Sequence, residues 1–154
     1  MPRRNILVAA FAVIAGLVAS IWARLLAPAA AAAAGAPDNP KVVYHLCDLD
    51  KVSFVLGNIQ NHYDGMGGAN RVTIALVVHG PALRAFHAGH ASADVAQRLR
   101  GFAKDGLELD ACGNTMRAQN VTVRDLLPGF INAERGGVVR IAELQAQGYA
   151  YLRP

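Results

Sequence analysis

The pattern of hydrophobic and polar positions divides the chain near residue 41. Residues 6–23 carry no charge, and an alanine-rich run follows that ends in the proline-containing stretch 37–40. From Lys41 onward, short apolar runs alternate with segments whose apolar residues recur at helical spacing. The pattern predicts a leader with an alanine-rich tether, residues 1–36, and one folded domain, residues 41–154.

Within the domain, apolar runs predict strands, and the segments between them predict helices or turns. Strands are expected at 42–47, 71–78, 107–112, 130–134 and 149–154. Helices are expected from residue 52 to about 65, from Ser92 to Gly106 and over 136–148. The inward positions of the first two helices are expected at Val52, Val55, Leu56, Ile59, Tyr63, Val95, Leu99 and Phe102.

Turn and cap residues mark the ends of these elements. Asp48 or Asp50 is expected to cap the first helix, and Gly65 to end it. Residues 79–91 predict a loop with one helical turn, and Thr122 and Asp125 stand at capping-box spacing. Buried strands joined by helical crossovers are typical of a parallel sheet with helices on both faces, which places the domain in the α/β class.

The leader has the composition of an export signal or of a membrane anchor. Arg3 and Arg4 precede the apolar stretch, and small residues that fit an A-x-A cleavage motif follow Arg24. Residues 6–23 also approach the roughly 20 apolar residues that span a membrane. Either outcome predicts an extracytoplasmic, periplasmic domain, because the arginines favour the inner side. If the leader is uncleaved, residues 6–23 tether the domain to the inner membrane.

The net charge of +4 belongs mainly to the leader. Three of the fifteen basic residues lie there and no acidic residue precedes Asp38, so twelve basic and eleven acidic residues remain for the domain. A nearly neutral domain gives no support to nucleic-acid binding. A P-loop and a dinucleotide-binding glycine fingerprint are also absent from the sequence.

Reactive or titratable residues follow the predicted strands. In open parallel sheets, ligands bind outside the carboxyl ends of the strands. Cys47, His79, Cys112 and Glu134 fall at the ends of the first four strands. These four residues are therefore the first candidates for a functional site.

Cys112 has the surroundings of a reactive thiol and also those of a buried one. Gly113, Asn114 and Thr115 follow it and can supply backbone N–H donors, and Arg117 adds positive charge. Asp110 lies two residues earlier on the same strand face, where its charge is expected to raise the thiol pKa. Cysteine is also among the most buried residue types, so simple packing is the alternative.

Cys47 leaves three interpretations open, because the domain has only two cysteines. A structural disulfide fits an exported protein and requires that the two strands be neighbours. The other interpretations are a redox or sulfur-relay pair and two unconnected buried thiols.

The histidines give weaker signals. His87 and His90 are three residues apart, and together with His79 they provide a metal-binding alternative, although no complete zinc ligand set is evident. His79 is the histidine best placed to act as a base or donor near the cysteines. His45 is expected in the strand environment of the core, and His62 on a solvated helix face.

Four segments in order resemble the DsrE/DsrF-like family of small sulfur-relay proteins, in its exported branch. These segments are "VVYHL", "LVVHGPALRAF", "GLELDACGNTM" and "LQAQGYAYLRP", and the resemblance covers residues 41–154. It implies a three-layer α/β/α sandwich with a five-stranded, mainly parallel sheet that assembles into homo-oligomers, trimers or hexamers. It also implies that the cysteine after the third strand, here Cys112, carries sulfur as a persulfide. The family's carriers continue with an Arg-Arg-Gly run, whereas this chain has only Arg117, and Cys47 does not belong to the family pattern.

Two functional hypotheses follow, and neither requires a cofactor. In the first, Cys112 accepts sulfane sulfur and exchanges it with a donor or acceptor protein. Gly113, Asn114 and Thr115 stabilise the charge, His79 or Arg117 assists, and Cys47 resolves the persulfide or forms a disulfide. In the second, the domain is a non-catalytic module that binds a small ligand or forms an oligomeric scaffold, and its cysteines are structural.

Overall fold

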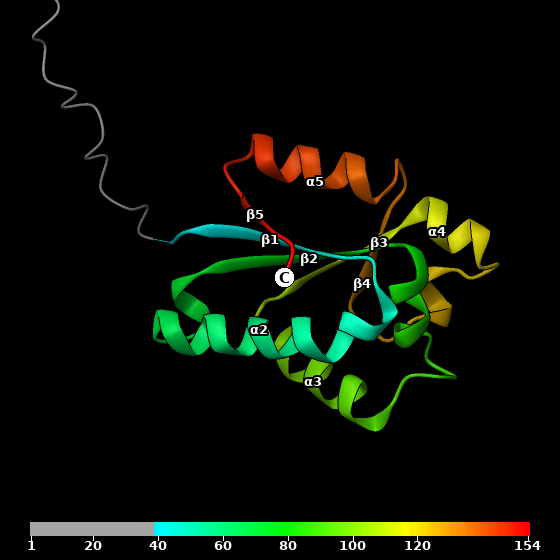
Figure 1. Cartoon of the computed structure of the whole chain (residues 1–154), viewed down its shortest axis with the longest axis horizontal. Helices are drawn as coiled ribbons and strands as arrows, with labels where there is room; N and C mark the ends of the chain where they lie inside the picture. The colour runs from blue at the N-terminus through cyan, green and yellow to red at the C-terminus, as the bar shows by residue number, and fades with distance from the viewer. Residues whose placement is uncertain (1–38) are drawn as a thin grey trace, which may run out of the picture. The chain divides into compact units, whose positions relative to one another are not determined.

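Five parallel strands form one sheet in the order β4-β3-β2-β1-β5 (Figure 1). This computed structural model describes residues 39–154. The strands are β1 (Lys41–Leu46), β2 (Thr73–Val78), β3 (Glu108–Cys112), β4 (Phe130–Ala133) and β5 (Ala150–Leu152). The structure confirms the predicted five-stranded α/β fold, and every strand pair in it is parallel.

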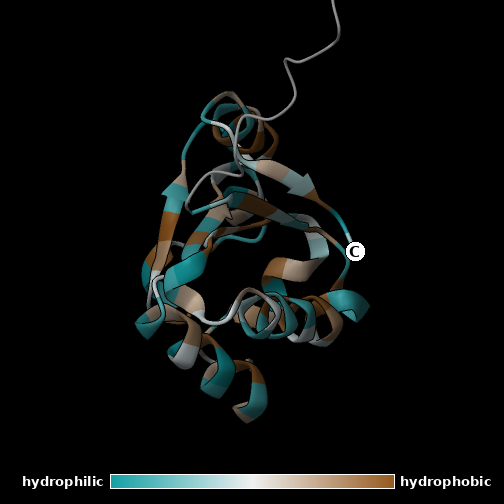
Figure 2. Ribbon diagram, turned by 90° about the vertical axis from the view of Figure 1, so that its left-hand side faces the viewer, coloured by the Kyte–Doolittle hydropathy of each residue, from teal (hydrophilic) through white to brown (hydrophobic). Residues whose placement is uncertain are grey.

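Helices cover both faces of the sheet and make three layers. In Figure 1, α2 and α3 lie on one side, α5 lies on the other, and α4 sits beyond the end of β3. The helices are α2 (Val52–Met66), α3 (Ala93–Lys104), α4 (Gly113–Ala118) and α5 (Gly137–Ala146), and the 3₁₀ turns are η1 (Leu49–Lys51), η2 (Ala69–Arg71), η3 (Gly80–Phe86) and η4 (Val123–Asp125). Figure 2 shows hydrophobic and hydrophilic stretches alternating along the helices, as expected for elements with one buried face.

The helix ends agree only in part with the sequence-based expectation. All eight predicted inward residues of α2 and α3 are buried, the Ser92 hydroxyl accepts a hydrogen bond from the N–H of Val95, and Thr122 and Asp125 form a capping box. Neither Asp48 nor Asp50 caps α2, because the turn η1 intervenes and already supplies the hydrogen-bonded first turn. The helix continues past Gly65 to Met66 and is capped by Gly67, whose left-handed φ of 84° favours glycine.

Alternation along the strands separates a large core from a small one. Val42, Tyr44 and Leu46 face the large core beneath α2 and α3. Residues of the opposite parity face a small core of Val43, Ala75, Val77, Ile141 and Leu144 beneath α5. Because α5 alone covers this second face, it leaves room at the strand ends for polar side chains.

The leader predicted from the sequence lies outside the described residues. Within residues 39–154, no helix has both the length and the apolar character needed to cross a membrane.

Candidate functional site

The strand register places Cys47, His79 and Cys112 in one row at the carboxyl edge of the sheet. Leu46 pairs with Val78, and Val78 pairs with Ala111, so the next residue of each strand continues the row. The N–H of His79 donates to the carbonyl of Leu46 at 3.0 Å, which confirms this register beyond the ladder. All three side chains have the strand parity of the α5 face. The structure therefore brings together three of the four strand-end residues expected from the sequence.

Cys112 lies between the starts of two helices. Burial raises the pKa of its thiol, but hydrogen bonds from the Thr115 hydroxyl and from the backbone N–H groups of Gly137, Thr115 and Asn114 lower it, and the resulting pKa lies below the ordinary value. Thr115 and Asn114 belong to α4, whereas Gly137 begins α5. The sulfur is thus surrounded by donors that favour the thiolate, although the residue is only 5% exposed.

The three residues after Cys112 hold the strand ends together. A Cβ at Gly113 would lie 2.9 Å from the Asn132 side-chain oxygen and 3.0 Å from two carbonyl oxygens of the β4–α5 connection. Thr115 Oγ1 accepts a hydrogen bond of 2.9 Å from the N–H of Gly80, at the start of η3. Asn114 accepts a hydrogen bond from Arg117. Gly113, Asn114 and Thr115, which begin α4, therefore join β2, β3 and β4 around the sulfur.

Asp110 does not raise the thiol pKa as expected from the sequence. Its carboxylate is fully buried and accepts a hydrogen bond of 3.0 Å from Arg140 Nε on α5. The positive charge of Arg140 therefore compensates the negative charge of Asp110. Burial raises the pKa of Asp110 most, Arg140 opposes this effect and Glu108 adds to it, and the resulting pKa is about 6. Its second oxygen, Oδ2, has no hydrogen-bond partner in the described part of the chain. Asp110 therefore bears on the stability of the protein through its ion pair with Arg140, and not on the pKa of the Cys112 thiol.

Arg117 and Glu134 are not brought to the Cys112 sulfur. The Arg117 guanidinium donates a hydrogen bond to Asn114, and Arg117 lines a pocket with Met116 and residues 121–124. Glu134 lines a cavity of about 350 Å³ that also includes Asp110 and Arg140. The Arg117 side chain turns back along its own helix, so this structure does not place its charge at the Cys112 sulfur.

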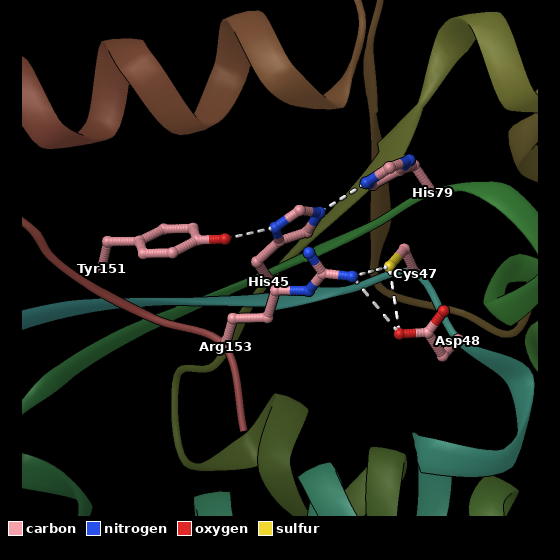
Figure 3. Close-up of polar contacts among 6 residues, drawn as sticks. All are labelled: His45, Cys47, Asp48, His79, Tyr151 and Arg153. Carbon is pink, nitrogen blue, oxygen red and sulfur yellow. Dashed lines mark hydrogen bonds and ion pairs between the residues drawn. The ribbon is translucent and has the colours of Figure 1, made fainter.

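His79 faces a residue that the sequence analysis assigned to the core. His45 and His79 approach each other through their Nε2 atoms, and their rings stack at 18° with centroids 4.7 Å apart (Figure 3). His45 Nδ1 is 2.7 Å from the Tyr151 hydroxyl on β5. His45, Cys47 and His79 form a cluster whose ligand atoms all lie within 4.8 Å of one another. The core assignment of His45 was wrong because its strand face is covered only in part by α5.

Charged neighbours surround this histidine–cysteine cluster on the β5 side. Arg153 donates to Cys47 Sγ at 3.0 Å and to Asp48 at 3.4 Å, and the Cys47 thiol donates to Asp48 at 3.3 Å (Figure 3). Burial, followed by His79 and Arg153, lowers the pKa of His45 to about 4. Burial also lowers the pKa of His79, and raises that of Cys47. Both imidazoles are therefore neutral at pH 7, and Cys47 is a thiol.

A disulfide between the two cysteines does not form. Both are free in the structure, and β2 lies between their strands. Two strand spacings separate the cysteines by about 9–10 Å, whereas a disulfide requires Cα atoms roughly 4.4–6.8 Å apart. The disulfide and the direct resolving role of Cys47 are therefore excluded within one chain in this arrangement.

The alternative metal group of His79, His87 and His90 is not assembled. His87 Nε2 lies 2.8 Å from the side-chain oxygen of Gln119, and its ring centroid is 6.5 Å from that of His90. His79 instead meets His45, which the sequence analysis missed as a site residue. The signal was the His-x-Cys spacing of 45 and 47, which puts both side chains on one face of a strand.

Replacing Thr115 by valine is expected to raise the pKa of the Cys112 thiol, because the hydroxyl that stabilises the thiolate is lost. The pH titration of thiolate ultraviolet absorbance, in a Cys47→Ser background, measures this pKa. Thr73→Val is the matched control. Thr73 begins β2, at the end of the strand away from the cysteine row, so its replacement should leave the pKa of Cys112 unchanged. An equal pKa in Thr115→Val and the unchanged protein would contradict the proposed hydrogen bond.

Comparisons with known proteins agree with this fold. MTH1491 from Methanobacterium thermoautotrophicum, a protein of unknown function, superposes with a TM-score of 0.66 and 25% identity, covering 75% of this chain and 100% of its own. The ychN protein from E. coli superposes with a TM-score of 0.53 and 11% identity, covering 75% and 99%. A search of curated protein sequences gave no match. The sequence model of the DsrE/DsrF-like family matches residues 27–154, and the chain therefore belongs to the DsrE/DsrF-like family.

Proposed function

We propose that this protein is an exported sulfur carrier that holds sulfane sulfur as a persulfide on Cys112. Membership in the DsrE/DsrF-like family suggests sulfur relay in general. The observation that carries the assignment to Cys112 is the set of donors around its sulfur, which come from the starts of α4 and α5 and lower the thiol pKa. Cys47 has the opposite environment, because burial and Asp48 raise its pKa.

Sulfur uptake is a displacement at the sulfane sulfur of a donor. The Cys112 thiolate attacks that sulfur, the sulfur–sulfur bond of the donor breaks, and the leaving thiolate or sulfite takes the electron pair. The product is a Cys112 persulfide anion, so no net oxidant or reductant is required. Transfer onward repeats the step in reverse, when an acceptor thiolate attacks the terminal sulfur and Cys112 leaves as thiolate.

The donors around Cys112 support both directions of this exchange. They stabilise negative charge on the cysteine sulfur when it is the nucleophile and again when it is the leaving group. Since Cys112 is 5% exposed, the terminal sulfur needs an approach path at the strand edge. Gly137, whose Cβ position would lie 3.3 Å from the Cβ of Cys112 and 3.4 Å from that of His79, borders that edge.

Export and assembly are parts of the same proposal. The leader supports delivery across the inner membrane, and the family supports a homo-oligomer that meets donor or acceptor proteins. His79 contributes as a neutral neighbour of Cys112 in the same strand row.

The test is to trap the persulfide on the purified, reduced domain. Incubation with thiosulfate or polysulfide is expected to add about 32 Da, one sulfur atom, in the intact mass. Cys112→Ser should remove the adduct, and Cys47→Ser should keep it. An adduct that survives Cys112→Ser, or no adduct at all, would contradict the proposal and favour the non-catalytic binding or scaffold module.

A further inference from the structure

We propose that His45, Cys47 and His79 form a binding site for a monovalent copper ion. This site lies beside the sulfur-carrying cysteine and does not include it. Each residue offers one soft or borderline ligand atom, and the three atoms lie within 4.8 Å of one another. Ions held at about 2.0 Å from nitrogen and 2.3 Å from sulfur need ligand atoms roughly 3.5–4 Å apart, so small side-chain rotations complete the site.

The strand pairing brings these ligands together. His45 and Cys47 are two residues apart on the β1 end and project to the same face, and His79 is the neighbour of Cys47 in the adjacent β2 row. All three residues are partly exposed, so an ion can reach them from solvent. The site is therefore held by backbone hydrogen bonds of the sheet and not by a mobile loop.

The Nε2 atoms of the two histidines face one another. Without an ion, one Nε2 carries the proton that the other accepts, because two bare lone pairs would repel each other. When both Nε2 atoms bind an ion, that proton moves to Nδ1 of the same ring, so each ring stays neutral and offers its Nε2 lone pair. The pKa of each imidazole is lowered by burial, which keeps both rings in the neutral form that binds metals.

Tyr151 supplies the outer support that ligand histidines usually have. Its hydroxyl lies 2.7 Å from His45 Nδ1, the ring nitrogen that does not face the cluster (Figure 3). A hydrogen bond at this atom fixes the ring orientation and leaves Nε2 free to bind the ion. Tyr151 comes from β5, so the end of the chain completes the site.

Charge and ligand number favour Cu⁺ over a divalent ion. Binding displaces the Cys47 thiol proton to solvent, and the resulting thiolate neutralises Cu⁺. Arg153 and Asp48 already balance each other beside the sulfur. A divalent ion would leave an uncompensated positive charge near Arg153. Thiolate with two imidazoles also completes a three-coordinate site for Cu⁺, whereas the same three residues would leave Zn²⁺ with a fourth position that water has to fill.

The experiment is an anaerobic competition for Cu⁺ between the purified domain and a chromogenic Cu⁺ chelator. We expect one Cu⁺ per chain. His45→Ala and Cys47→Ser should each weaken binding by about 100-fold or more, and Tyr151→Phe by about 10-fold, as for outer-shell partners. His90→Ala is the matched histidine control and Cys112→Ser the matched thiol control, and both should bind as the unchanged protein does.

The outcomes separate this site from the sulfur carrier. Equal affinities for His45→Ala, Cys47→Ser and the unchanged protein would overturn the site, as would loss of binding in Cys112→Ser. Displacement of bound Cu⁺ by equimolar Zn²⁺ would overturn the choice of ion. Circular dichroism verifies that the variants fold. If His45→Ala does not fold, the smaller change Tyr151→Phe still tests the site through its expected loss of affinity. His45→Ala should still form the Cys112 persulfide, so failure of either proposal leaves the other testable.

Discussion

Replacing Arg140 by methionine is expected to lower the free energy of unfolding by about 3–5 kcal/mol at pH 7, the usual cost of leaving a buried charge without its partner. Arg140 Nε binds the fully buried Asp110 at 3.0 Å, and its guanidinium also contacts Glu108. Methionine keeps much of the side-chain volume but removes the cation. Urea unfolding followed by circular dichroism measures the change.

A pH series and a double variant distinguish the charge from packing. Burial raises the folded-state pKa of Asp110 from 3.8 to about 6, so the folded protein binds more protons than the unfolded chain between these values. The contribution of Asp110 to stability should therefore fall as the pH rises from about 4 to about 6. Asp110→Asn should remove this slope, and Arg140→Met/Asp110→Asn should recover most of the loss at pH 7. An equal loss in the single and double variants would show that packing, and not charge, accounts for the effect.

Replacing Gly113 by alanine is expected to lower the free energy of unfolding by about 1–3 kcal/mol, as overpacked cores do. The new methyl group would meet the carbonyl oxygens of Ala133 and Glu134 at 3.0 Å and Asn132 Oδ1 at 2.9 Å. Two of these contacts are backbone atoms, so the β4–α5 connection must move. That connection leads to Gly137, whose N–H binds the Cys112 sulfur. The thiol pKa should therefore rise as stability falls.

Gly101→Ala is the control for this substitution. Gly101 lies in α3, and a Cβ there meets no atom within 4 Å. Alanine should stabilise the helix by about 0.5–1 kcal/mol without changing the thiol pKa. Chemical denaturation and thiolate titration of both variants measure the two effects. Gly113→Ala with unchanged stability and thiol pKa would contradict the close packing at the end of β3.

The local periodicity of the sequence predicted most of the fold. The inward residues of α2 and α3, the cap at Ser92 and the strand-end position of Cys112 each depend on neighbouring residues along the chain. The start of α2 was less accurate, because Asp48 and Asp50 match the pattern of a cap while the turn η1 satisfies the backbone. The resemblance in four segments correctly indicated the DsrE/DsrF-like family.

The arrangement of the candidate site depended on contacts that local patterns do not specify. Asp110 has the strand parity of Cys112, but only the packing of α5 shows that Arg140 binds its carboxylate. His45 looked like a core residue, because the sequence does not reveal that one helix alone covers its face.

The sequence alone determined the alternation of strands and helices, and with it the placement of Cys47, His79 and Cys112 at carboxyl ends of parallel strands. Hydrophobic periodicity contains this information, because the spacing of buried side chains along one segment depends only on whether that segment is a strand or a helix. The tertiary structure decided the order of the strands. By placing β2 between β1 and β3 it separates the cysteines, and by pairing β5 with β1 it brings Tyr151 and Arg153 to His45 and Cys47. Strand order depends on pairings between residues far apart in the chain. The hydrophobic pattern of each strand does not say which other strand lies beside it.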